Sequence, residues 1–193
     1  MTSAAKIPKI LVIMGSIREN RNCKVISDWI LEVARQTGHK LEFELVDLQT
    51  WELPNDELNL PSQHKYESEY TKKWSEYVDS ANGFLMVSPQ YNWGYPAALK
   101  NALDHLYQEW HNKPVLLVTY GGHGGSKCNA QLREVFQGLK MKNMQTSPQI
   151  SISREQILNG VKESDPSFTE YKPVVEKAIN ELADSFEPSS GTN

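Results

Sequence analysis

Apolar and polar residues alternate along this chain in two periods, one typical of strands and one typical of helices that cover a sheet. Apolar runs predict five strands, at residues 10–14, 41–46, 83–87, 114–119 and around 150–152. Five groups of apolar residues at helical spacing predict five helices: Ile26, Trp29, Ile30 and Val33; Trp74, Tyr77, Val78 and Ala81; Leu99, Ala102, Leu103 and Leu106; Leu132, Val135, Phe136 and Leu139; Val175, Ala178, Ile179 and Leu182. Strand and helix alternate throughout, which predicts an α/β protein with a parallel sheet between two helical layers.

The composition of the strands predicts their order in this sheet. Residues 10–14, 83–87 and 114–119 are apolar throughout, as is typical of strands buried on both faces. Residues 41–46 and the strand near 150–152 alternate with polar residues, which favours the two edges. These positions match the flavodoxin-like order 2-1-3-4-5 of a five-stranded, three-layer sandwich. The six-stranded dinucleotide-binding order needs a strand that we do not find.

The stretch from Ser88 to Leu106 contains the most distinctive chemistry. Pro89 ends a strand because it has no N–H for a sheet ladder, and Pro96 suits the first position of a helix. The loop between them holds aromatic, amide and glycine residues: Gln90, Tyr91, Asn92, Trp93, Gly94 and Tyr95. Such a loop can bind an electron-rich group beside a helix N-terminus. The alternative is a tight turn with buried aromatics.

Two further loops follow strands that the predicted order makes neighbours. Residues 15–22, GSIRENRN, combine a turning glycine with Arg18 and Arg21, a set that suits a terminal phosphate, although neither G-x-G-x-x-G nor G-K-S/T is present. Residues 120–126, YGGHGGS, hold four glycines, whose N–H groups could form an anion-binding nest. A solvated turn and a flexible loop are the respective alternatives.

Together the three loops predict one composite site at the carboxyl edge of the sheet. A mononucleotide with a broad planar ring spans such a site, and FMN fits best. Its phosphate would lie at Arg18, and the pyrimidine edge of its ring would face the main chain of Gln90–Gly94, Gly121 and Gly122.

The motifs GSIRENR, SPQYNWGYPAALKNALDHLYQEW and YGGHGG resemble the NAD(P)H-dependent FMN reductase family, and more closely its fungal quinone-reductase and azoreductase-like members. The resemblance covers nearly the whole chain. It implies a flavodoxin-like fold, tightly bound FMN and a homodimer with the flavin near the subunit interface. By position, it assigns cofactor contacts to Ser16, Arg18, Asn22 and Cys23 at the phosphate, to Pro89, Gln90, Tyr91, Asn92, Trp93 and Gly94 at the ring, and to Tyr120, Gly121 and Gly122 on its other side. Many relatives have a serine or another small residue where Asn22 and Cys23 stand here.

The resemblance also implies a ping-pong reaction. NADPH or NADH would donate hydride, and a quinone, an azo compound or free flavin would then take two electrons at the same face. Flavin N5 would do the chemistry, so no side chain is assigned as catalytic and no metal is expected. Trp93, Tyr95 and His123 are candidate substrate contacts.

Composition and net charge limit the kinds of partner and the compartment that we expect for this protein. The chain has 193 residues and a formal net charge of −4, which predicts one domain over residues 1–187 and disfavours nucleic acid as a partner. No apolar run reaches 18 residues, so we expect no membrane span. Without a signal-peptide pattern, Cys23 and Cys128 are expected to be free thiols in a cytoplasmic protein. Residues 188–193 are small and polar, and we expect a disordered tail.

Several questions stay open. Residues 48–67 have no clear period and fit either a loop that borders the site or a surface loop without a role. Tyr107 and Trp110 fit either the core or, as the resemblance slightly favours, a dimer surface. An electron carrier and a flavin-based redox sensor acting through a protein partner are alternative functions. The sequence does not distinguish NADPH from NADH, a dimer from a tetramer, or one acceptor from another.

Overall fold

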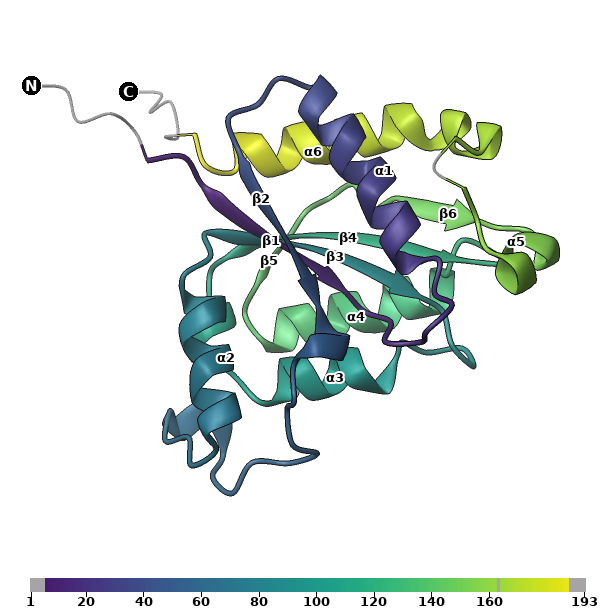
Figure 1. Ribbon diagram of the computed structural model, residues 1–193. Helices are drawn as coiled ribbons and strands as arrows, with labels where there is room; N and C mark the ends of the chain where they lie inside the picture. Colours follow the sequence, from purple (N-terminus) through teal and green to yellow (C-terminus); the bar gives the residue numbers. More distant parts are fainter. Residues whose placement is uncertain (1–5, 163, 188–193) are drawn as a thin grey trace, which may run out of the picture.

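A single parallel sheet forms the centre of the molecule, and helices cover both of its faces (Figure 1). The computed structural model describes residues 6–162 and 164–187, and the tail expected at 188–193 lies outside the described residues. The strands are β1 (Lys9–Met14), β2 (Glu42–Asp47), β3 (Gly83–Pro89), β4 (Pro114–Gly121), β5 (Lys142–Asn143) and β6 (Gln149–Ser151). The α-helices are α1 (Cys23–Gln36), α2 (Glu69–Asp79), α3 (Ala97–Asp104), α4 (Ser126–Gly138), α5 (Arg154–Asn159) and α6 (Lys172–Asp184). The described residues also contain four 3₁₀ helices, at Leu48–Thr50, Pro61–Gln63, Gln108–Trp110 and Pro166–Tyr171.

The strand order is β2-β1-β3-β4-β5, with β6 also paired to β4, and every pair is parallel. The predicted flavodoxin-like order is therefore confirmed. The prediction of one last strand near 150–152 was incomplete, because two short strands share that edge. Pro148 has no N–H for a ladder, and between the two strands the Ser147 hydroxyl donates to the Leu117 carbonyl oxygen at 2.7 Å.

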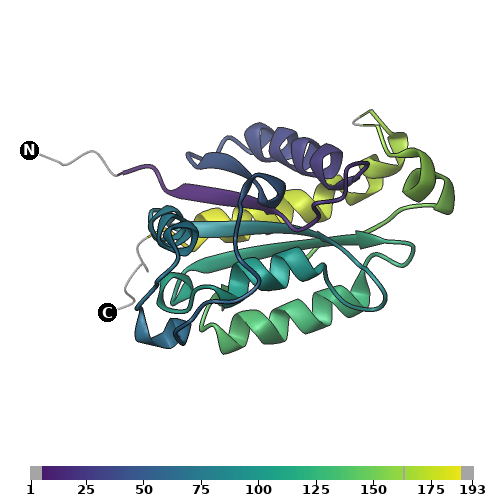
Figure 2. The ribbon, with the colours of Figure 1, turned by 60° about the horizontal axis from the view of Figure 1, so that its bottom comes forward.

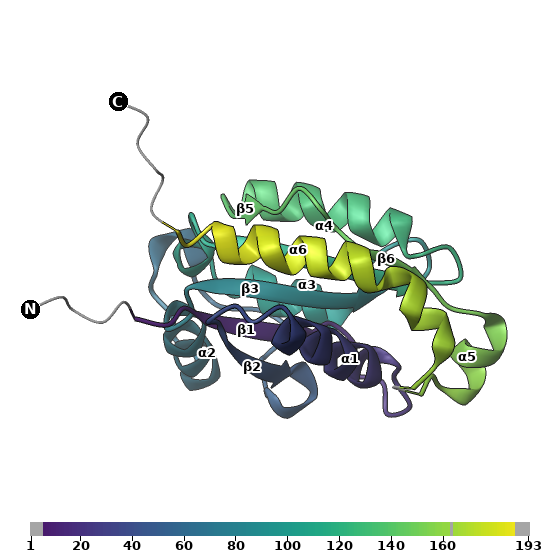
Figure 3. The same ribbon diagram turned by 90° about the horizontal axis from the view of Figure 1, so that it is seen from above.

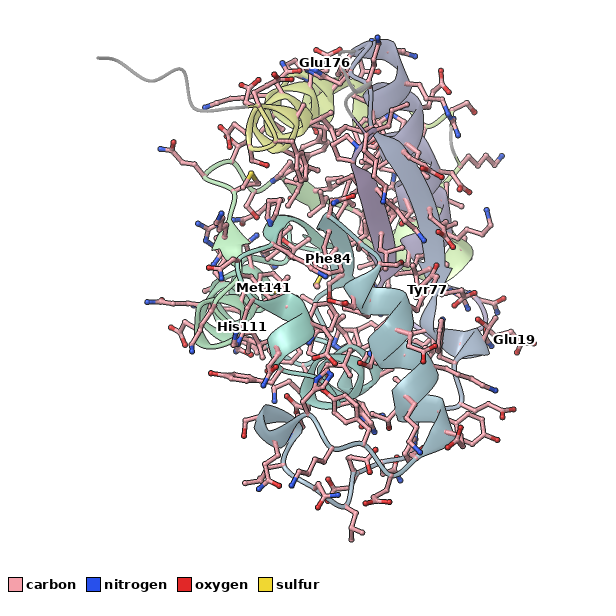
Figure 4. The ribbon with its side chains drawn as sticks, turned by 90° about the vertical axis from the view of Figure 1, so that its left-hand side faces the viewer. Glu19, Tyr77, Phe84, His111, Met141 and Glu176 are labelled. Atoms are coloured by element: carbon pink, nitrogen blue, oxygen red, sulfur yellow. The ribbon has the colours of Figure 1, made fainter. Side chains whose placement is uncertain are left out.

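The sheet separates two apolar cores. Helices α1 and α6 cover one face, and α2, α3 and α4 cover the other (Figures 1 and 3). Figure 2 shows α1, in indigo, above the sheet and α4, in green, below it. Successive residues of β1 alternate between the cores, with Val12 in the first and Ile13 in the second. Phe84 and Met141, labelled in Figure 4, belong to the second core. This burial on both faces explains why β1, β3 and β4 are apolar throughout.

Residues 48–67 are held against the second core. Trp51 packs against Trp74 and Tyr77, with ring centroids 4.7 and 5.1 Å apart. The Asn101 side chain donates to the Pro54 carbonyl oxygen at 2.9 Å, whereas Leu58 is 84% exposed. The segment is thus a cover for α2 and α3, with two exposed apolar residues, Leu58 and Leu60, in its second half.

The slight preference for Trp110 at a dimer surface was wrong. Its side chain is 0% exposed, packs edge-on against Phe84 at 4.9 Å, and donates its indole N–H to the Leu103 carbonyl oxygen at 3.1 Å. An indole with a buried partner for its N–H is stable in a core, and sequence spacing alone does not reveal that partner. Tyr107 is half-buried.

Two helices differ from the expected pattern. α3 ends at Asp104, before the buried Leu106 that the spacing assigned to it. α5 was not predicted, because its residues show no helical apolar period and it is only 6 residues long. In the described ranges, no helix is long and apolar enough to span a membrane.

Gly125 allows the chain to turn tightly from β4 into α4. Its φ is +77°, and a Cβ there would lie 2.9 Å from the Thr119 Cβ and 3.1 Å from the Tyr120 main chain. We expect Gly125→Ala to lower the free energy of unfolding by about 2 kcal/mol or more, since it adds a clash to a strained φ. Urea unfolding followed by circular dichroism measures the change.

Gly138→Ala is the matched control, because a Cβ at this end of α4 would meet no atom within 4 Å. It should leave stability unchanged or raise it by about 0.5–1 kcal/mol. Equal stabilities of the two variants would contradict the close approach described for Gly125.

Candidate functional site

The loops that follow β1, β3 and β4 meet at one edge of the sheet, because the carboxyl ends of parallel strands lie together. They enclose a cleft with a volume of about 160 Å³. Its lining comes from all three loops, from the residue after β6 and from α5: Arg18, Asn20, Arg21, Asn22, Pro89, Gln90, Tyr91, Tyr120, Gly121, Gly122, Ile152 and Ile157. The three loops that the predicted strand order makes neighbours therefore line one cleft.

The first loop lies directly against the end of β3. The Gly15 N–H donates to the Val87 carbonyl oxygen at 2.8 Å, and a Cβ at Gly15 would lie within 3.2 Å of both Val87 and Ser88. Buried Ser16 shares a hydrogen bond of 2.6 Å with the Tyr91 hydroxyl. A glycine at position 15 thus allows the first and second loops to touch.

Arg18 and Arg21 bring positive charge to this end of the cleft. The Arg18 guanidinium lies over the Tyr91 ring, 3.7 Å from its centroid, and has no carboxylate partner among the described residues. Arg21 forms an ion pair with Asp47 and donates to Gln49 at 2.6 Å. Its Nε is buried without a hydrogen-bond partner in the described part of the chain. Arg18 is therefore the more available cation, and Arg21 adds one unused donor.

Asn22 and Cys23, both predicted cofactor contacts, lie at the start of α1. Their side chains form hydrogen bonds with other parts of the protein. The Asn22 carboxamide is bonded at both ends to residues 156–161, so only its main chain is free for a ligand. Cys23 is 0% exposed and its thiol donates to the Val87 carbonyl oxygen at 3.2 Å. Any contact from Cys23 must come from its backbone at the helix N-terminus.

The second loop folds into a two-residue hairpin at its tip. The Tyr91 and Gly94 main chains exchange hydrogen bonds of 3.0 and 2.9 Å, and Asn92 and Trp93 between them have φ values of 46° and 70°. A left-handed φ is uncommon for a residue as bulky as Trp93 and costs energy. Trp93 is nevertheless 69% exposed, with the Lys127 ammonium 5.1 Å from its ring. The hairpin therefore presents an indole to solvent beside the cleft.

Gln90 joins the second loop to the third. Its side-chain oxygen accepts from the N–H of Lys127 at 2.9 Å and from that of Cys128 at 3.4 Å, at the start of α4. The N-cap residue Gly125 has no side chain for this purpose, so Gln90 supplies the missing cap. The Gln90 N–H also donates to the Tyr120 carbonyl oxygen at 2.9 Å.

Part of the main chain of the third loop is accessible to a ligand. A Cβ at Gly122 would meet nothing within 4 Å. Within the described ranges, the N–H groups of Gly122 and His123 have no hydrogen-bond partner. His123 is exposed. Tyr120 is buried, and its burial raises the pKa of its phenol well above the usual value, so the phenol stays protonated. The loop therefore offers two main-chain donors to a ligand.

None of the three candidate substrate contacts belongs to the lining of the cleft. Tyr95 is half-buried and packs on the second core, while Trp93 and His123 are exposed at the rim. A larger cavity of about 660 Å³ lies on the other side of the first loop, between Ile17, Trp51 and α3. Leu48, Trp51, Leu53 and Asn55 line this second cavity, whereas the lining of the cleft includes no residue of 48–67.

Ile152 and Ile157 line the cleft but were not predicted as site residues. Ile152 was visible only as part of an expected strand. Ile157 had no sequence signal, because α5 is too short to show a period and its position beside the first loop depends on tertiary contacts.

The family model described as NADPH-dependent FMN reductase matches residues 8–155. An NAD(P)H-dependent FMN reductase of Schizosaccharomyces pombe is 45% identical over 183 residues, covering 93% of this chain and 91% of the relative. One of Saccharomyces cerevisiae is 50% identical over 145 residues, covering 69% and 75%. The solved flavoenzyme NAD(P)H:(acceptor) oxidoreductase FerB of Paracoccus denitrificans shares the fold, with a TM-score of 0.71 at 18% identity and coverage of 93% and 99%.

The two thiols beside the cleft should be unreactive in the folded protein. Burial raises the pKa of the Cys23 thiol to about 11 and that of Cys128 also to about 11, and both side chains are 0% exposed. At pH 8 only about one thiol in a thousand would be ionised, and the thiolate is the reactive form. We expect a colorimetric disulfide reagent to label neither cysteine at pH 8 within minutes.

The same sample in guanidinium chloride should release colour from 2 thiols, the number in the chain. Rapid labelling of either cysteine in native buffer would show that the described packing around these thiols is wrong.

Proposed function

The chain belongs to the NADPH-dependent FMN reductase family, with FMN and NAD(P)H as its cofactors, and on that premise we propose that it transfers two electrons by a ping-pong mechanism to quinones, azo compounds or free flavin. The convergence of three loops on one cleft is the observation that carries the proposal. The acceptor classes rest on the resemblance of the three motifs to quinone-reductase and azoreductase-like members.

The donors at the first loop fit the phosphate of FMN. Arg18 is a cation without a carboxylate partner among the described residues, and the Arg21 Nε is a buried donor with none of its own. A phosphate oxygen is a strong acceptor for both kinds of group. The Ser16 hydroxyl accepts a hydrogen bond from the Arg18 N–H at 3.4 Å. Ser16 therefore orients the loop that would hold the phosphate.

The second and third loops fit the flat ring. Gly122 leaves open space where any other residue would place a Cβ, so a planar group can approach the main chain there. The N–H groups of Gly122 and His123 can donate to the carbonyl edge of such a ring. We propose Pro89, Gln90, Tyr91, Asn92, Trp93, Gly94, Tyr120, Gly121 and Gly122 as the residues that surround it.

When bound, FMN supplies the redox chemistry by accepting a hydride from NAD(P)H and passing two electrons to the acceptor. The side chains bind and orient. Tyr120 stays protonated because it is buried, and Cys23 stays a neutral thiol, so neither competes as a base or nucleophile. The exposed Trp93 indole offers a flat apolar surface at the rim, which suits successive binding of a nicotinamide and an aromatic acceptor.

We also propose that the protein is a cytoplasmic homodimer with the flavin near the subunit interface. The resemblance supports the dimer. The two free, buried thiols support a reducing compartment, since cytosolic proteins seldom keep disulfides.

The spectrum and kinetics of the purified protein test the reaction. We expect flavin absorption that bleaches anaerobically with NADPH and returns with a benzoquinone. Double-reciprocal plots at several acceptor concentrations should be parallel, because the donor leaves before the acceptor binds. Intersecting lines would contradict the ping-pong mechanism, and folded protein that takes up no FMN at micromolar concentration would contradict the whole proposal.

Arg18→Ala tests the phosphate assignment. Loss of a charge-assisted hydrogen bond should raise the dissociation constant for FMN about tenfold to a hundredfold. The constant for riboflavin, which lacks the phosphate, should stay the same. Quenching of flavin fluorescence on binding measures both.

Arg35→Ala is the matched control, because Arg35 is exposed at the other end of α1 and pairs only with Glu32 among the described residues. It should change neither constant. Equal losses for FMN and riboflavin in Arg18→Ala would place Arg18 at the ring instead.

A further inference from the structure

Residues 153–161, which include α5, form a wall beside the end of the first loop and contribute Ile157 to the lining of the cleft. Figures 1 and 3 both show α5 beside the loop that joins β1 to α1. Ser153 and Gln156 form a capping box that begins the helix. Ile157 is 49% exposed and lines the cleft, whereas its neighbour Leu158 is 71% exposed and does not. The family match ends at residue 155, within this wall, so Ile157 lies beyond it.

Asn22 holds the wall from the side of the first loop. Its Nδ2 donates to the Gln156 carbonyl oxygen at 2.9 Å, and its Oδ1 accepts from the Val161 N–H at 2.9 Å. The residue is only 8% exposed. One carboxamide thus joins the start of α1 to both ends of a segment more than 130 positions away in sequence.

A second set of contacts holds the wall from behind. The Gln156 Nε2 donates to Asp165 at 2.8 Å and to the Ser167 hydroxyl at 3.1 Å. Val161 is 7% exposed and belongs to the first core. The backbone of α5 is therefore held on two sides, while Ile157 is half exposed and lines the cleft.

We infer that Ile157 is a contact residue for the bound flavin and that Asn22 is a positioning residue that holds Ile157 in place. This inference rests on the proposed function. An apolar side chain gains by losing its remaining water to carbon atoms of the ring or ribityl chain, and gains nothing from a phosphate. The contact therefore strengthens binding of FMN and of riboflavin equally, and Asn22 acts on both through the wall.

Ile157→Ala and Leu158→Ala form a matched pair on one short helix. We expect Ile157→Ala to raise the dissociation constants for FMN and riboflavin by a common factor of about five to ten, and to speed flavin release in stopped-flow fluorescence. Leu158→Ala should match the wild type in both. Equal behaviour of the two variants would overturn the inference.

Asn22→Ala tests the positioning role. It should weaken both flavins alike and increase amide hydrogen exchange across residues 156–161. In the Ile157→Ala background it should have little further effect, because the group it positions is gone. Weakening of FMN alone would instead place the Asn22 side chain at the phosphate and overturn its assigned role.

Two observations separate the possible failures. Wild-type protein that binds no flavin would contradict the proposed function itself. Wild-type protein that binds FMN, with Ile157→Ala unchanged, would contradict only this inference. Because Asn22 is buried, its variant is compared with the wild type by thermal unfolding, and the exposed Ile157→Ala keeps the test decisive if Asn22→Ala does not fold.

Discussion

The parallel pairing of β1, β3 and β4 is the constraint on which the site depends. Met14 pairs with Val87, and Pro89 pairs with Tyr120, so the three strands end at nearly the same height. Parallel strands need a crossover helix before the chain returns, and each crossover begins with a loop at this same edge. Residues from three distant parts of the sequence therefore meet in one cleft.

The three loops are held together by side chains that the sequence analysis predicted as contacts of the cofactor. Ser16 bonds to Tyr91, Gln90 caps α4, and Asn22 holds residues 156–161. What remains for a flavin is the main chain of the third loop, the Arg18 guanidinium and the Arg21 Nε. This division is physically reasonable, because a flat cofactor needs donors at fixed positions, and side chains bonded to each other fix the main chain.

Tertiary contacts also explain the incorrect and missing predictions. Trp110 has an apolar ring with one polar atom, so its burial depends on whether a carbonyl oxygen lies within reach, and Leu103 provides one. The last edge of the sheet is divided between β5, whose residues are Lys142 and Asn143, and β6, which begins directly after Pro148, a residue without an N–H for a ladder. Helix α5 is short and has no apolar face to anchor it. Its capping box and its hydrogen bonds to Asn22, Asp165 and Ser167 fix its position instead.

The sequence alone determined the first four strands, their order and the three loops of the cleft, because burial on one or both faces gives a strand a recognisable pattern of apolar residues. It also determined the family, since the loop motifs are local and contiguous. Only the tertiary structure decided which side chains of those loops face a ligand and which face each other. That choice depends on partners more than 70 residues away, as for Ser16 with Tyr91 and Asn22 with Gln156, and no local pattern of residues records such a distance.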